Sequence, residues 1–151
     1  MRISKRSLRR ALRSERGTSI VEFAILAPIL IFLVIGVIEI GRYMYFGIVA
    51  AHMAESGARY GAQSLGTAAD VAGMRTAAIA DGSGLGWTVS PAKSCSQAGS
   101  VVGCPAATPG PGTIYYVKVV VTANFSPLLN YPGIPSSIPV SSTAMVRVQN
   151  Q

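Results

Sequence analysis

An uncharged apolar segment near the N-terminus constrains this chain more than any other feature of its sequence. The segment reads FAILAPILIFLVIGVI over residues 23–38 and directly follows Glu22. The apolar character extends from about Thr18 to Ile38, which as a helix is about 31 Å long and sufficient to cross a bilayer once. The sequence therefore predicts one transmembrane helix.

A basic tail precedes this segment, and Glu15 is its only acidic residue. Its basic side chains are Arg2, Lys5, Arg6, Arg9, Arg10, Arg13 and Arg16. The net charge of +7 is thus concentrated in the tail, which argues against nucleic acid as a partner. Basic flanks of transmembrane helices stay in the cytoplasm. We therefore expect a single-pass protein of the inner membrane, with its N-terminus in the cytoplasm and its C-terminus outside.

A cleaved secretory signal peptide is the alternative explanation for a basic and then apolar N-terminus. The apolar core of such a peptide has about 7–15 residues and is followed by small residues at the cleavage site. Here the apolar run is longer, and the first small-residue site, VAA at 49–51, lies beyond Glu39 and Arg42. Ordinary signal cleavage is therefore not expected.

Cys95 and Cys104 enclose a short loop rich in glycine and serine. In an oxidising compartment outside the cytoplasm, two such cysteines can form a disulfide. Metal binding is the alternative, but the only histidine, His52, is distant in the sequence. We predict a disulfide and no metal site.

The helical pattern continues beyond the apolar span, to about Gln63. One apolar stripe at spacings of three and four comprises Ile40, Met44, Ile48, Ala51, Ala54, Ala58 and Ala62. Glu55 and Arg59 lie off this stripe at a spacing that favours an ion pair. Pro28 predicts a kink or a loosened segment within the helix.

Gly57 and Gly61 have the small-xxx-small spacing that lets helix backbones approach closely, although either glycine could be tolerated by chance.

The rest of the chain predicts a small α+β head. Thr67 and Asp70 stand in capping-box register for a short helix that ends near Asp81. Alternating apolar residues predict strands at 114–125 and 140–149, and WTV at 87–89 is a candidate third strand. The buried faces are expected to carry Tyr115, Val117, Val119, Val121 and Phe125, and Val140, Ala144, Val146 and Val148. The predicted fold class is therefore α+β, a long N-terminal transmembrane helix continuing into a pilin-like head with a small antiparallel sheet.

Clustered catalytic side chains are not evident in the sequence. His52, Glu55 and Ser56 could be imagined as a nucleophile set on one helix. Neighbouring helix positions rarely aim three such groups at one reacting atom, and a solvated helix face explains these residues better. We therefore expect no enzymatic activity and no cofactor.

The stretch RGTSIVEFAILAPILIFLVIGVIEIGRYMYFGIVAAHMAESGARYGA, residues 16–62, resembles the TadE-like family of the tight adherence (Tad, or Flp) pilus systems. The residues that carry the resemblance, in order, are Gly17, Glu22, Phe23, Pro28, Glu39, Gly41, Arg42, Tyr45 and Gly57 to Tyr60. As in type IV pilin precursors, the resemblance implies that a prepilin peptidase cuts after Gly17, so that Thr18 begins the mature chain. Glu22, with Phe23 beside it, would then serve assembly by pairing with the new α-amino group of a neighbouring subunit.

The resemblance implies a minor pseudopilin, or an assembly or priming subunit, of a Tad-type pilus that supports adhesion. Its parts would be a basic cytoplasmic leader (1–17), a transmembrane and extended helix (18–65) and an extracytoplasmic head (66–151). The implied partners are the membrane, the peptidase, other Tad pilins or pseudopilins and the assembly platform, with incorporation into an extracellular pilus as one outcome. The alternative is a permanently anchored structural or binding module of the envelope, in which Glu22 only reaches the lipid headgroups.

Overall fold

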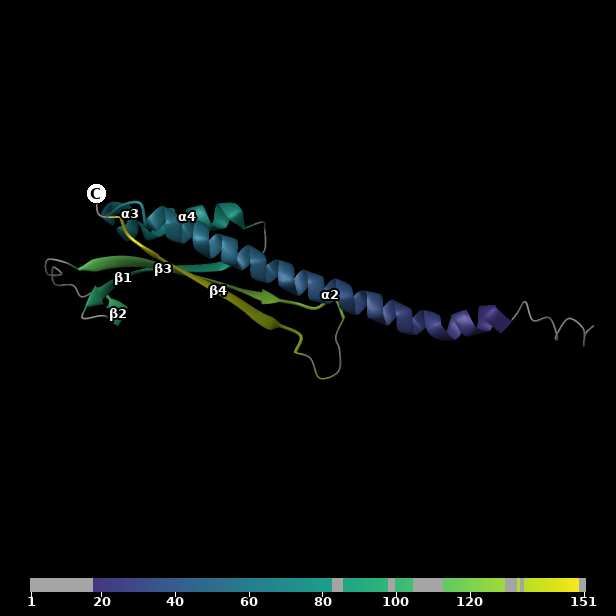
Figure 1. The fold of residues 1–151 in the computed structure, drawn as a ribbon. Helices are drawn as coiled ribbons and strands as arrows, with labels where there is room; N and C mark the ends of the chain where they lie inside the picture. Colours follow the sequence, from purple (N-terminus) through teal and green to yellow (C-terminus); the bar gives the residue numbers. More distant parts are fainter. Residues whose placement is uncertain are drawn as a thin grey trace, which may run out of the picture. The chain divides into compact units, whose positions relative to one another are not determined.

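A computed structural model describes residues 18–82, 86–97, 100–104, 113–129, 133 and 135–149. The chain divides between Gly41 and Arg42 into two units, which are described separately below. One long helix, α2 (Thr18–Gly61), contributes to both units. Figure 1 shows its course and the elements that follow it.

Helix α2 has 44 residues and confirms the predicted long N-terminal helix within two residues at either end. Pro28 lies inside it, and helical structure continues on both sides of the proline. Up to Gly41, nearly all large apolar side chains of this helix are exposed, including Ile20, Phe23 and Phe32. A helix with apolar residues around its circumference is unsuited to water and needs lipid or protein around it.

The second unit, Arg42–Gln151, is called the head below. It begins with the C-terminal part of α2, followed by α3 (Leu65–Ala69) and α4 (Val71–Asp81). We expected one helix beginning at Thr67 and Asp70, and this was wrong. The capping box is formed by Ser64 and Thr67, which exchange side-chain to backbone hydrogen bonds, and it opens α3. Asp70 then caps α4. The first turn of a helix leaves backbone N–H groups unpaired, and a capping side chain accepts hydrogen bonds from them. Ser64 caps α3 in this way and Asp70 caps α4, so the segment forms two helices instead of one.

Asp70 also connects α4 to α2. One carboxylate oxygen accepts a hydrogen bond from the backbone N–H of Gly73 at 2.9 Å, and the other accepts one from the Tyr60 hydroxyl at 3.0 Å. Both hydrogen bonds favour the charged form and lower the pKa of Asp70 from its ordinary value. The bond from Gly73 has the larger effect and the bond from Tyr60 the smaller one.

The strands of the head form one antiparallel sheet in the order β2-β1-β3-β4. The strands are β1 (Thr88–Gln97), β2 (Ser100–Gly103), β3 (Ile114–Phe125) and β4 (Ile138–Arg147). Beyond β4, the N–H of Val148 donates to the carbonyl of Tyr115, and that of Gln149 donates to the carbonyl of Ala62 at the end of α2. The end of β4 is thereby bonded to both layers of the head.

Strand β1 is longer than the three residues expected at 87–89 and passes through Pro91. The sequence TVSPAKSCSQ has no apolar alternation, so its strand character was not visible. Pro91 lies opposite Val119 of β3, whereas β2 pairs only with residues 94–97. Among the described residues, no strand pairs with the other side of β1 at Pro91, and proline is tolerated at such a sheet edge.

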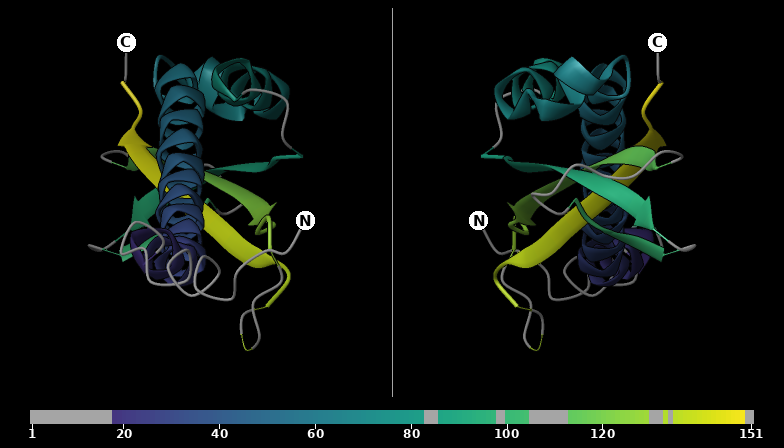
Figure 2. Two further views of the ribbon diagram at one scale, coloured as in Figure 1. Left: turned by 90° about the vertical axis from the view of Figure 1, so that its right-hand side faces the viewer. Right: turned by 90° about the vertical axis from the view of Figure 1, so that its left-hand side faces the viewer.

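Helices α2 and α4 pack on one face of this sheet, and the core lies between the two layers (Figures 1 and 2). The predicted inward faces of β3 and β4 are confirmed, with Val117, Val119 and Val121 fully buried. The predicted helix stripe is wrong in its first half. Ile48 is 58% exposed, whereas Met53 is fully buried. The face of α2 toward the sheet includes Ala50, Met53, Ala54 and Ala58, and the buried Ala62 directly follows the helix.

Glycine at two helix positions allows this close packing of layers. A Cβ atom at Gly57 would stand 2.9 Å from the main-chain oxygen of Met74 and 3.1 Å from the Cβ atom of Ala78, both in α4. A Cβ atom at Gly61 would overlap the sulfur of Met74. The small-xxx-small pair therefore serves contacts inside the head, where α2 crosses α4.

The predicted disulfide is confirmed. Cys95 of β1 is bonded to Cys104, which directly follows β2, across a sequence separation of 9. Cys95 pairs with Val102 in the hairpin register, so the covalent bond connects two neighbouring strands. The bond occupies both sulfur atoms, which removes the metal-binding alternative for these cysteines.

Candidate functional site

The predicted processing and assembly residues lie at the start of α2. Gly17 is outside the described residues, and Thr18 is the first residue of the helix. Glu22 follows one turn later, and its side chain is exposed, as is that of Phe23. The first turn of α2 contains no acidic residue. The roles assigned to these four residues stay predictions.

The surface of α2 after these residues is suited to an apolar surrounding. Within the described residues, one helix, Ser19–Gly61, is long and apolar enough to cross a membrane. A Cβ atom at Gly36 or Gly41 would meet nothing within 4 Å among the described atoms. These two glycines therefore offer flat helix surface, in contrast to Gly57 and Gly61, which are used inside the head.

An aromatic cluster forms where the head begins. Phe125, the last residue of β3, has its ring centroid 5.6 Å from that of Tyr43 and 5.2 Å from that of Phe46. The guanidinium of Arg42 lies 5.2 Å from the centroid of the Phe125 ring. Phe46 in turn lies 5.7 Å from Trp87, between ring centroids. Sequence reasoning missed this cluster, although an Arg-Tyr-Met-Tyr-Phe run that begins at Arg42, soon after an apolar span ends at Ile38, is a signal of a membrane boundary.

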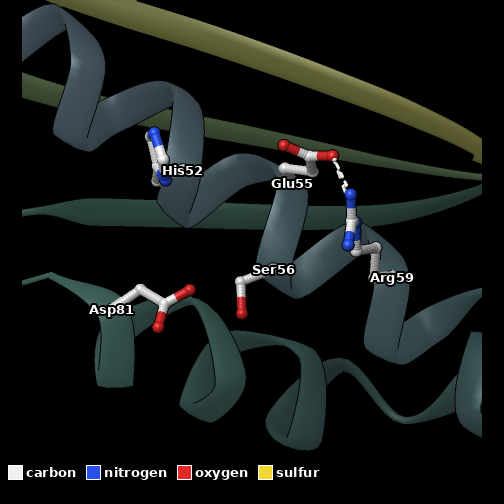
Figure 3. A pocket seen from close by; sticks show the side chains of 5 residues that line it. All are labelled: His52, Glu55, Ser56, Arg59 and Asp81. Carbon is white, nitrogen blue, oxygen red and sulfur yellow. Dashed lines mark hydrogen bonds and ion pairs between the residues drawn. The ribbon is translucent and has the colours of Figure 1, made fainter.

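A polar hollow lies between α2 and α4, as Figure 3 shows. It is lined by His52, Glu55, Ser56, Arg59 and Asp81. The predicted ion pair is confirmed here, because Nη2 of Arg59 stands 2.6 Å from Oε1 of Glu55. Both side chains are well exposed, so the pair contributes little to stability.

The same hollow contains the residues considered above as a nucleophile set. The hydroxyl of Ser56 donates to the carbonyl of Ala77 at 3.3 Å, and the carboxylate of Glu55 accepts from Arg59. No hydrogen bond from His52 to Ser56 or Glu55 occurs among the described residues. A nucleophile needs a base within hydrogen-bond reach, whereas Ser56 donates to a main-chain carbonyl and Glu55 accepts from Arg59.

The fold and the helix surface together define a class of protein. One long apolar N-terminal helix, suited to a single membrane crossing, continues as a layer of a small α+β head.

Residues 17–59 match the family model described as TadE-like protein. The match covers less than a third of the chain and ends inside α2. The resemblance predicted from the sequence is thereby confirmed over this segment. A TadE-like segment indicates a pseudopilin-type component of a Tad pilus, which is a structural class of protein rather than an enzyme family. Searches among curated proteins and among solved structures gave no match.

Proposed function

We propose that this chain is a minor pseudopilin, or an assembly or priming subunit, of a Tad-type pilus. In this proposal the N-terminal part of α2 anchors the precursor in the inner membrane, with the head outside the cytoplasm. A prepilin peptidase removes residues 1–17, and the processed subunit joins other Tad pilins at the assembly platform and supports adhesion. The observation that carries the proposal is the TadE-like match over residues 17–59, which coincides with a helix whose large apolar side chains are nearly all exposed up to Gly41.

The position of Glu22 supports a role in assembly. Cleavage after Gly17 would create an α-amino group on Thr18, which is cationic at neutral pH. This cation would stand at the N-terminus of α2, where the helix dipole is already positive. A carboxylate close to it offsets both charges. In an apolar filament interior such a pair is stronger than on a surface, although desolvation opposes part of the gain.

Two arrangements can supply that carboxylate. Glu22 of the same chain stands four residues after Thr18, one helical turn away. Glu22 of a staggered neighbour is the arrangement proposed here, because it would connect subunits as well as neutralise the amine. The two arrangements differ in what the loss of Glu22 does to assembly.

N-terminal sequencing and intact mass of the protein purified from membranes test the processing step. The expected mature chain begins at Thr18 and lacks residues 1–17. Co-purification with other Tad pilins would support the assembly role in the same preparation. A mature protein that retains residues 1–17 and brings down no pilin would overturn the proposal in favour of a permanently anchored envelope module.

A further inference from the structure

Two adjacent leucines are exposed on the segment that follows β3. Leu128 is 63% and Leu129 is 39% exposed, next to Pro127. No charged residue occurs in the sequence from Ser126 to Pro139. A pair of large apolar side chains in an uncharged stretch of sequence is a candidate contact with another apolar phase.

The contacts of Phe125 show which part of the head lies next to these leucines. Phe125 precedes Leu128 by three residues and contacts Arg42, Tyr43 and Phe46. These three helix residues lie within the first five positions of the head unit, and three residues separate them in the sequence from the apolar span that ends at Ile38. The leucine segment therefore starts beside the helix residues with which the head unit begins.

The neighbouring side chains have the composition of a membrane interface. Tyr43 and Tyr45 are exposed, and Arg42 lies against the Phe125 ring. Tyrosine is enriched at the headgroup level of bilayers, where its ring is apolar and its hydroxyl is hydrated. An arginine there keeps its charge in the headgroup region while its stem lies on apolar surface.

From these contacts we propose that Leu128 and Leu129 insert into the interface of the outer leaflet. The head would then have a second attachment to lipid beside its helix, until the subunit leaves the membrane for an assembly. This inference rests on the proposed membrane insertion of α2. The partner is a lipid surface, recognised by apolar burial and an aromatic rim rather than by a specific headgroup.

The structure supplies a matched control at the other end of the head. Leu65, at the start of α3, is 42% exposed, close to the value for Leu129. It follows the end of α2, about 30 Å along the helix from Arg42. A leucine of equal exposure at that end should stay in water if the head is held by the segment after β3.

The experiment uses the full chain reconstituted in phosphatidylcholine vesicles, with and without brominated acyl chains. Single variants Leu128→Cys, Leu129→Cys, Leu65→Cys and Ile31→Cys each carry an NBD fluorophore. The native cysteines are joined and do not react without reductant. We expect bromine quenching and a blue-shifted emission at positions 31, 128 and 129, and at least twofold weaker quenching at 65.

Each contrary outcome has a separate meaning. Quenching at 31 without quenching at 128 and 129 overturns the inference and leaves the membrane anchor intact, with the leucines facing water or protein. Equal quenching at 65 and 129 also overturns it, because the head would then lie on lipid without a preferred end. Absence of quenching at 31 overturns the proposed membrane insertion, and the inference with it.

Discussion

Gly57 of α2 lies directly against the backbone of α4, because a Cβ atom at this position would stand 2.9 Å from the carbonyl oxygen of Met74. Helix α2 can approach α4 this closely only where a residue has no side chain. The contact lies inside the head and joins the C-terminal part of the TadE-like segment to α4.

Replacement of Gly57 by alanine should therefore destabilise the head. We expect Gly57→Ala to lower the free energy of unfolding by about 1–3 kcal/mol, since overpacking outweighs the better helix propensity of alanine. Gly47→Ala is the matched control, because a Cβ atom there meets nothing within 4 Å. It should be neutral or stabilising by up to about 1 kcal/mol. Chemical denaturation in detergent micelles, followed by circular dichroism, measures both, and equal effects would contradict the packing argument.

The carboxylate of Asp70 should make the stability of the head depend on pH. Its hydrogen bonds to Gly73 and Tyr60 lower its pKa in the folded state, so the charged form stabilises folding. This contribution is complete above the ordinary value of 3.8 and is lost as the pH falls below that value through the lowered pKa.

The variant Asp70→Asn keeps a capping side chain but cannot ionise. Its melting temperature should fall below that of the native chain at pH 6, and the difference should shrink toward pH 3. If the difference in melting temperature is the same at pH 6 and pH 3, the charge of Asp70 does not contribute to the stability of the head.

Removal of the disulfide should weaken the hairpin of β1 and β2. For the loop closed between Cys95 and Cys104, the chain-entropy relation gives a loss of about 2–3 kcal/mol in the double variant Cys95→Ser/Cys104→Ser. A reductant should shift the native chain toward this variant and leave the variant unchanged. Alkylation of the denatured native chain without reductant should label neither cysteine, and labelling of both would refute the bridge.

Variants at Gly17 and Glu22 should separate processing from assembly. Gly17→Val should leave a full-length precursor, because a side chain hinders close approach of the backbone to the peptidase. Glu22→Ala should still be processed and stay in the membrane, but should co-purify with partner pilins at least several-fold less well. Intact mass reports the first effect and co-purification the second. Normal co-purification of the Glu22 variant would favour pairing within one chain, or a carboxylate that only reaches the headgroups.

The charge distribution predicts the orientation of the chain. A phosphatase reporter fused after Gln151 should be active, since the basic tail is expected to hold the N-terminus in the cytoplasm. The matched fusion before Met1 should be inactive. The reverse pattern would invert the topology and would remove the oxidising compartment on which the sequence argument for the disulfide depends.

The sequence was sufficient for the elements with strong periodicity. Helix α2 was predicted correctly because its apolar run is long. The inward valines of β3 were predicted correctly because they alternate without interruption. The sequence was insufficient to predict which face of α2 packs on the sheet. The helix is apolar on several sides after residue 41, so the spacing that links Met44 to Ile48 is as regular as the one that links Ala50 to Ala54. Only the second pair meets the sheet.

The parts that were missed depend on tertiary contacts. Strand β1 contains Pro91 and serines, which are typical of a loop, and it extends only because β3 offers a partner along its length. The aromatic cluster joins Phe46 to Phe125 and Trp87, residues far apart in the sequence. No local pattern predicts that meeting. The TadE-like segment was found because its signal is contiguous and lies in one helix.

The strand order has a consequence for how the chain is made. A ribosome synthesises β4 after every other described element, yet β4 covers one long edge of the central strand β3. Until residue 147 has emerged, the valine-rich β3 has an unpaired edge, which is a template for pairing with other chains. The hydrogen bonds from Val148 to Tyr115 and from Gln149 to Ala62 can form only after residues 148 and 149 have also emerged. A chain interrupted before residue 138 would therefore expose this edge permanently and would be a substrate for quality-control proteases.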